Sequence, residues 1–268
     1  KVLPKYLFYV LSENDFPVRG GGQPFMSKGD VQKYKIPLPP IEVQEQIVAE
    51  LDGYHNIISG ARQIVESWRP DIKIPEEVGM VKVGSVVDFV SGVTLAIGDC
   101  ENENGVPIIT IADVAEDGSL KLANLRRVKT DKNVNILQKG DLLFNWRNGS
   151  KDLVGKTAYF NLDGEYIFAS FLLGIRPKKE LIESKFLWFL LNKYRAEGKY
   201  LDFMRQNVNG LFNREELKDV EIPLPSLTMQ KDIIEEVESE RELVKSSKKM
   251  IEIYEQKTKG VLSKLWAE

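Results

Sequence analysis

Apolar side chains recur along residues 41–69 at alternating intervals of four and three residues. This pattern places one apolar stripe along a helix and is typical of a helix that packs lengthwise on another helix. Pro70 follows the stripe and ends the predicted helix, because the residue before a proline disfavours helical backbone. The predicted seam positions are Ile47, Leu51, Tyr54, Ile58, Ala61, Val65 and Trp68.

A second long helix is predicted over residues 226–266, with a stripe that polar Glu240, Ser247 and Thr258 interrupt. Its predicted seam positions are Ile233, Val237, Val244, Ile251 and Tyr254. Two stripes of similar spacing in one chain most simply pack on each other. We therefore predict an antiparallel coiled coil, with two ordinary core helices as the alternative.

The residues between the two helices have the composition of strands and turns. Segments such as "VPIITIADV" and "GDLLFNW" are rich in branched and aromatic residues, and glycine and Asp-Gly breaks separate them. An aromatic helix is predicted over residues 185–197. The predicted fold class is therefore α+β: a globular mixed α/β domain flanked by two long helices.

The chain contains one phrase twice. "IPLPPIEVQEQI" begins at Ile36 and "IPLPSLTMQKDI" at Ile222, and "KYLFYVLS" from Lys5 resembles "KFLWFLLN" from Lys185. Each copy predicts an aromatic helix, a loop and a β-segment that lead into a long helix. We expect four parts: the tail of a first domain (1–40), a first spacer helix (41–69), a complete domain (75–225) and a second spacer helix (226–266).

Composition favours a water-soluble chain that acts inside the cell. No apolar run approaches the roughly 18 residues that a membrane span needs, and no signal peptide is visible. The lone Cys100 excludes an internal disulfide and fits a reducing cytoplasm. The net charge of −3 argues against coating nucleic acid by bulk charge, but a local basic groove remains compatible with it.

The sequence lacks the usual marks of a catalytic site. His55 is the only histidine and lies within the first predicted helix, so Ser-His-Asp and Cys-His nucleophile systems are disfavoured. No Cys/His metal cluster, Walker loop or glycine-rich cofactor loop is present. We expect no catalytic residue, no metal and no cofactor.

Three stretches of the central domain have the composition of a DNA-binding surface. They run from Lys121 to Lys132, from Asn145 to Lys156 and from Arg205 to Glu216, and they combine Lys and Arg with Asn, Gln and Trp. Lys and Arg hold phosphates, while Arg and Asn pair with base edges in a duplex. Each stretch alone would equally suit a solvated loop, so the prediction depends on finding three in one domain.

The order of short motifs resembles one known family. "FVSGVTL" (89–95), "GVPIITIADV" (105–114), "QKGDLLFNWRNGS" (138–150) and "LVGKTAYF" (153–160) precede the second "IPLP" phrase, and Gln44 and Gln230 follow the two phrases. The chain thereby resembles the DNA-specificity subunits of type I restriction–modification systems over nearly its whole length. It departs from the family pattern at Leu95, where many members have proline, and at Trp146-Arg147.

The resemblance implies a non-catalytic subunit that reads one half of a bipartite duplex site. It implies two long helices that set the spacer and dock the methyltransferase (modification) subunits, which bring the restriction subunit into the complex. Arg147 and Asn148 are expected to read bases, and Lys129 and Lys151 to hold phosphates. The predicted DNA-contact residues are Thr94, Arg126, Arg127, Lys129, Trp146, Arg147, Asn148, Ser150, Lys151, Asn207 and Asn209.

Two other functions and one other assembly stay open from the sequence. The domain could be a scaffold that docks partners without binding DNA, in keeping with the acidic isoelectric point near 5.6. It could be a nucleic-acid methyltransferase, which the missing cofactor loop disfavours. It could also be a half subunit that forms a homodimer and so recreates two reading domains.

Overall fold

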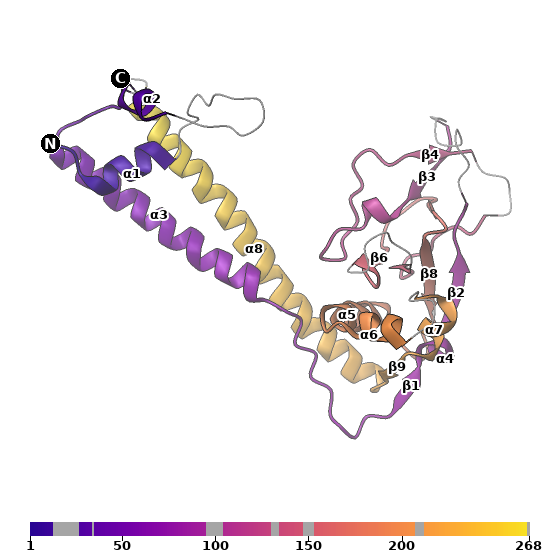
Figure 1. Cartoon of the computed structure of the whole chain (residues 1–268). Coiled ribbons are helices and arrows are strands. Elements are labelled where there is room, and N and C mark those ends of the chain that lie inside the picture. The colour runs from indigo at the N-terminus through magenta and orange to yellow at the C-terminus, as the bar shows by residue number, and fades with distance from the viewer. Residues whose placement is uncertain are drawn as a thin grey trace. The chain divides into compact units, whose positions relative to one another are not determined.

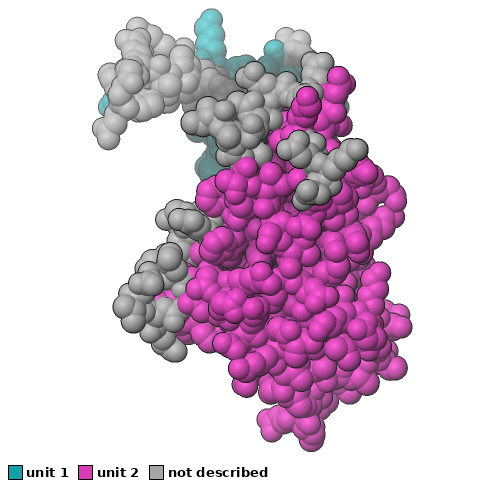
Figure 2. All heavy atoms as spheres, turned by 90° about the vertical axis from the view of Figure 1, so that its right-hand side faces the viewer, with its two compact units in different colours: residues 1–68, 240–268 teal, residues 69–239 magenta. Residues whose placement is uncertain are grey.

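The computed structural model describes residues 1–12, 27–33, 35–94, 104–129, 134–146, 153–206 and 212–266. Two compact units share these residues (Figures 1 and 2). Unit 1 contains residues 1–68 and 240–268, and unit 2 contains residues 69–239. One long helix, α8 (Leu227–Leu265), contributes residues to both units.

Unit 1 is helical in the part of the chain that the structure describes. It contains α1 (Pro4–Ser12), α2 (Lys28–Lys33), α3 (Ile41–Ser67) and residues 240–265 of α8. The helix α3 follows Pro39 and Pro40 and ends at Trp68, whose extended backbone (φ −63°, ψ 131°) precedes Arg69 and Pro70. Both long helices thus occupy the stretches that the apolar stripes predict.

Within unit 1, α3 and α8 run antiparallel (Figure 1). The indole N–H of Trp68 donates to Glu240 at 2.9 Å, and the rings of Tyr54 and Tyr254 lie edge-to-face with centroids 5.3 Å apart. Leu262 packs in one cluster with residues from the start of α3. The end of α3 therefore meets the earlier part of α8, as the prediction of an antiparallel pair requires.

The helix pair of unit 1 has an internal two-fold relation. The two "IPLP" phrases differ by 186 residues, and by this offset Glu240 is equivalent to Tyr54 and Tyr254 to Trp68. Exchanging the helices therefore turns the Tyr54–Tyr254 contact into the Trp68–Glu240 contact. Ala61 and its equivalent Ser247 lie midway between these contacts, and both are buried small residues.

Unit 2 contains three small sheets. Strands β1 and β9 pair antiparallel, a four-stranded antiparallel sheet has the order β2-β8-β5-β6, and a three-stranded sheet has the order β4-β3-β7 with β3 and β7 parallel. The strands are β1 (Met80–Lys82), β2 (Val87–Ser91), β3 (Val106–Ile109), β4 (Arg127–Val128), β5 (Leu142–Asn145), β6 (Thr157–Tyr159), β7 (Ile167–Phe168), β8 (Leu172–Pro177) and β9 (Glu221–Pro223).

Helices cover the sheets of unit 2. They are α4 (Val83–Val86), the 3₁₀ turn η1 (Ile111–Asp113), α5 (Ser184–Ala196), α6 (Lys199–Gln206), α7 (Arg214–Asp219) and residues 227–239 of α8. Seven side chains of α5 are buried, and its Trp188 donates its indole N–H to Thr157 of β6 at 2.8 Å. One core cluster joins residues from β3, β5, β6, β7 and β8, among them Leu143, Phe168 and Leu172. The mixed α+β fold class is thus confirmed.

The "KGD" turn before β5 is a structural device. Gly140 has a φ of +97°, a conformation that residues with a Cβ adopt only at a cost. Asp141 is buried, and its two carboxylate oxygens accept from Arg176 of β8 at 2.8 and 2.7 Å. Asp141 also accepts from the backbone N–H of Gln138, so the motif joins the turn to two neighbouring strands.

One buried glutamine fastens the start of each long helix. In unit 1, Gln44 accepts from the N–H of Leu3 at 2.9 Å and donates to the carbonyl of Pro39 at 2.8 Å. In unit 2, Gln230 accepts from the N–H of Glu183 at 2.7 Å and donates to the carbonyl of Pro225 at 2.9 Å. Leu3 and Glu183 are equivalent in the repeat, as are Pro39 and Pro225. The two copies therefore share hydrogen bonds as well as sequence motifs.

Candidate nucleic-acid interface

Strand β4 and the two residues that flank it present three of the predicted phosphate and base contacts. Arg126, Arg127 and Lys129 are exposed, whereas Val128 between them is buried. Alternation along a strand therefore turns Arg127 and Lys129 toward solvent. Arg127 donates to the carbonyl of Gly105 at 2.8 Å, which fixes the base of its guanidinium while other N–H groups remain available.

These cations are not neutralised by nearby acids that the structure describes. Among the described residues, no carboxylate lies within 4.0 Å of Arg126, Arg127 or Lys129. Other cations of unit 2 are engaged: Arg195 pairs with Glu116 at 2.8 Å and thereby lowers the pKa of that carboxyl. Unpaired cations on an exposed strand edge are what a phosphate backbone requires.

Three chain segments meet beside the end of β5. Trp146 follows β5 and donates its indole N–H to the carbonyl of Ser170 at 3.0 Å. The N–H of Ser170 in turn donates to Val93 at 2.9 Å, and exposed Thr94 is the next residue. Gly92 is required here, because a Cβ would lie 2.7 Å from the carbonyl oxygens of Phe168 and Ala169. We call Val93, Thr94, Trp146 and Ser170 the Ser170 junction.

Asn145 closes the base of the loop that follows Trp146. It is fully buried, its amide donates to the carbonyl of Leu153 at 2.9 Å, and its backbone pairs with Gly155 and Lys156. Gly155 has a φ of +88°, and a Cβ there would lie 2.1 Å from the ring of Tyr200. The "GK" motif is therefore a packing requirement of this hairpin.

Six predicted contacts lie outside the described residues: Arg147, Asn148, Ser150, Lys151, Asn207 and Asn209. Their described neighbours do lie close together. Phe212 contacts Phe144 with ring centroids 5.7 Å apart, and Phe144 precedes Trp146 by two residues. The structure thus brings the bordering residues of two predicted loops to one end of β5.

The three-stranded sheet links the junction to the basic strand. β7 leads into Ala169 and Ser170, while β4 holds the arginines, and the two strands flank β3. Two strand spacings separate such neighbours by about 10 Å. The basic strand and the Ser170 junction are therefore linked through one three-stranded sheet.

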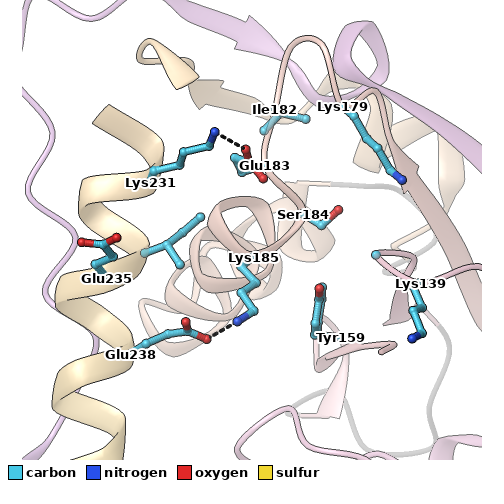
Figure 3. A pocket seen from close by; sticks show the side chains of 12 residues that line it. Lys139, Tyr159, Lys179, Ile182, Glu183, Ser184, Lys185, Lys231, Glu235 and Glu238 are labelled. Carbon is cyan, nitrogen blue, oxygen red and sulfur yellow. Dashed lines mark hydrogen bonds and ion pairs between the residues drawn. The ribbon is translucent and has the colours of Figure 1, made fainter. Parts of the chain in front are cut away.

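Unit 2 also contains a pocket of about 610 Å³ (Figure 3). Lys185 pairs with Glu238 of α8, and Lys231 of α8 lies 3.7 Å from Glu183 (Figure 3). The Lys185–Glu238 pair has its repeat equivalent in Lys5–Asp52 of unit 1, at 2.6 Å. The pocket is thus the joint between α5 and α8, and none of the predicted DNA contacts lines it.

The predicted seam residues divide between the units. Val244, Ile251 and Tyr254 belong to unit 1 with the α3 positions, whereas Ile233 and Val237 are buried within unit 2. Ile47, Leu51, Ile58 and Ala61 are buried, and Tyr54, Val65 and Trp68 are half-buried. Glu240 interrupts the apolar pattern, and the structure gives it a role as the acceptor for Trp68.

Two further findings concern site chemistry. Within the ranges that the structure describes, no group of three or more His, Cys, Asp or Glu is placed to hold a metal ion. No helix among those residues is both long and apolar enough to cross a membrane. The sequence analysis also missed Phe171, which is exposed beside the Ser170 junction. The apolar residues around it give no sign that this one faces solvent.

Comparison with known proteins places the chain. Residues 1–66 and 75–252 match the family model of the type I restriction modification DNA specificity domain. The MjaX and MjaVIII type I restriction enzyme specificity subunits of Methanocaldococcus jannaschii are 27% and 25% identical to it, over 73% and 97% of this chain. The chain spans 47% of the first relative and 68% of the second.

A solved structure supports the same fold. The HsdS subunit from Thermoanaerobacter tengcongensis matches with a TM-score of 0.54 and 22% identity, over 98% of this chain and 70% of that chain. The curated relatives are named specificity subunits, in agreement with the prediction of a non-catalytic chain. The motif order, the repeated helices and the family match lead to one conclusion: the chain belongs to the type I restriction–modification DNA specificity family.

Proposed function

We propose that unit 2 reads one half of a bipartite duplex DNA site as part of a type I restriction–modification complex. The observation that carries this proposal is that predicted contacts from separate chain segments are joined through one three-stranded sheet. The Ser170 junction holds Thr94 and Trp146 together, and exposed Arg126 and Arg127 follow on the far side of β3. Family membership supports DNA as the ligand.

The chemistry of this surface suits a duplex better than a protein partner. Unpaired Arg and Lys side chains attract phosphates, and the potential near them is set locally, so the net charge of −3 does not oppose binding. Arg147 and Asn148 continue the chain from Trp146 and have the side chains that pair with guanine and adenine edges. We assign base reading to these two residues and phosphate contact to Lys129 and Lys151.

The two long helices supply a spacer and a docking surface in this proposal. Helix α8 has 39 residues, which corresponds to about 58 Å. Ile64 of α3 is 49% exposed, and Leu243 and Met250 of α8 are 65% and 41% exposed. Met250 is the repeat equivalent of Ile64, and Leu243 that of half-buried Ile57.

Symmetry places these apolar side chains together. A two-fold axis that exchanges two antiparallel helices is perpendicular to the plane of the pair, so equivalent residues stay on one face. Ile57, Ile64, Leu243 and Met250 therefore form one exposed apolar face around Ala61 and Ser247. Such a face fits docking of helices from the modification subunits, with the restriction subunit joining through them. We expect this assembly to act on DNA in the cytoplasm, as the sequence analysis predicts.

The alternative is a scaffold or half subunit that acts through partner docking or homodimerisation without reading DNA. Replacing one predicted phosphate contact separates the two functions. In Lys129→Ala, affinity should fall alike for all duplexes, and the slope of log affinity against log salt should shrink by about one. Lys249→Ala, which removes an exposed lysine of unit 1, is the matched control.

Fluorescence anisotropy with labelled duplexes at several salt concentrations provides both quantities. Equal slopes for the chain and both variants would remove Lys129 from the interface. A chain that binds no duplex at low salt, while it still binds a modification subunit, would favour the scaffold.

A further inference from the structure

Phe171 is the exposed side chain of an otherwise buried stretch. In residues 167–175, seven residues are buried and Ser170 is half-buried, whereas Phe171 exposes 50% of its surface. The stretch crosses from β7 of the three-stranded sheet to β8 of the four-stranded sheet. A phenyl ring that leaves half of its surface in water contributes only part of its possible burial energy to the fold.

Hydrogen bonds hold the turn that carries Phe171 from every side. The N–H of Ala169 donates to Ile109 and the N–H of Leu172 donates back to Ala169, both at 2.9 Å. The N–H of Ser170 donates to Val93, and its carbonyl accepts the indole N–H of Trp146. Phe171 therefore projects from a fixed backbone. Binding a ligand at Phe171 then costs little conformational entropy of the protein chain.

The neighbours of this turn are predicted DNA contacts. Val93 precedes Thr94, and Trp146 precedes the expected base readers Arg147 and Asn148. Since the indole N–H of Trp146 is already donated to Ser170, Trp146 positions the turn and offers DNA only its ring face. Phe171 thus directly follows Ser170, to which both of these segments are hydrogen-bonded.

We propose that Phe171 is a specificity-determining residue that packs on the C5-methyl group of a thymine in the major groove. The inference rests on the proposed function and adds to it one residue and one feature of the base. A phenyl ring has no charge for a phosphate and no donor or acceptor for a base edge. The thymine methyl is the apolar group that the major groove displays, and Phe and the Thr methyl both contact it.

The test uses the full chain and duplexes that differ by single methyl groups. The chain first selects its preferred sequence from a random duplex pool, with a modification subunit present. Each thymine of that sequence is then replaced singly by uracil, which removes only the C5-methyl. For the unmodified chain, uracil at one position should weaken binding about threefold to tenfold, in line with burial of one methyl group.

The variant Phe171→Ala should bind the thymine and uracil duplexes equally at that position, at the weaker level. Phe171→Leu, which keeps an apolar side chain, should retain part of the difference. Phe8→Ala removes a similarly exposed phenylalanine of unit 1 and should leave the thymine preference intact. All variants change exposed residues, and unchanged thermal melts would verify their folding.

The outcomes separate the two proposals. If the chain selects a sequence but Phe171→Ala keeps its affinity and its thymine preference, Phe171 does not read DNA and the proposed function stands. If Phe171→Ala loses modification-subunit binding instead, the ring belongs to a protein contact and the inference is wrong. If the chain selects no sequence at all, the proposed function itself fails.

Discussion

At the scale of residues, several family-like motifs serve the fold and not the ligand. Asp141 accepts three hydrogen bonds in the "KGD" turn, two of them from Arg176. The hydrogen-bonded Asp141 carboxylate raises the pKa of the Arg176 guanidinium. A motif read from sequence as part of a recognition domain thus marks a buried ion pair that orders β5 and β8.

Removing the charge of Asp141 should destabilise unit 2. In Asp141→Asn the guanidinium of Arg176 keeps its charge but loses its carboxylate partner, which costs roughly 3 kcal/mol for a buried pair. Urea unfolding followed by circular dichroism measures the change. Asp163→Asn is the control, because the Lys139–Asp163 pair is exposed and contributes little. Equal unfolding midpoints for the two variants would contradict the structural role of Asp141.

The chemistry of the site was predictable only where it depends on residue type alone. The charges of Arg126, Arg127 and Lys129 could be read directly, and their exposure on β4 agrees with a surface role. The engagement of Trp146 with Ser170, 24 residues away, depends on strand pairing that no local pattern reveals. The exposure of Phe171 was hidden for the same reason, since an apolar run gives no clue to which member faces solvent.

At the scale of elements, the two sequence repeats make equivalent hydrogen bonds. Gln44 and Gln230 each join the carbonyl that precedes a long helix to the backbone at the start of an aromatic helix. A glutamine suits this position because its amide both donates and accepts. The sequence showed the glutamines in register after "IPLP", and the structure gives the physical reason for their recurrence.

Replacing Gln230 should loosen α5. In Gln230→Ala the N–H of Glu183 and the carbonyl of Pro225 lose their partner, which should cost about 2–4 kcal/mol. Hydrogen–deuterium exchange of peptides from α5 measures the local effect, and Gln256→Ala, an exposed position of α8, is the control. Protection of α5 that is unchanged in Gln230→Ala would show that the glutamine does not fasten it.

Long helices were the most predictable elements, and short strands the least. The bounds of α3 and α8 fall within two residues of the predicted stretches, because proline and the apolar period define them. Several strands have only two to four residues and take part in three separate sheets. Such strands are defined by distant partners, so the sequence indicated a β-rich region without its pairing.

At the scale of the whole molecule, helix α8 runs from the proposed DNA-reading unit into the helix pair that we propose as a docking surface. The apolar face of the α3–α8 pair should bind modification subunits. The double variant Ile64→Glu with Leu243→Glu puts charge on this face and should weaken that binding at least tenfold, since a buried unpaired carboxylate costs several kcal/mol. Surface plasmon resonance with the purified modification subunit provides the affinity.

The control for this docking test is Ser59→Glu, which adds one carboxylate at an exposed position of α3 one residue beyond seam residue Ile58. Loss of binding in Ser59→Glu and not in the double variant would place the docking surface on the other side of the pair.

The central claim is that unit 2 reads duplex sequence, and selection from random duplex DNA tests it most directly. The purified chain, mixed with its modification subunit, is used to enrich bound duplexes over several rounds, and the pool is sequenced. The account predicts enrichment of one short half-site, or of two copies at fixed spacing if the chain forms dimers. A pool that stays random while the modification subunit is bound would contradict the account.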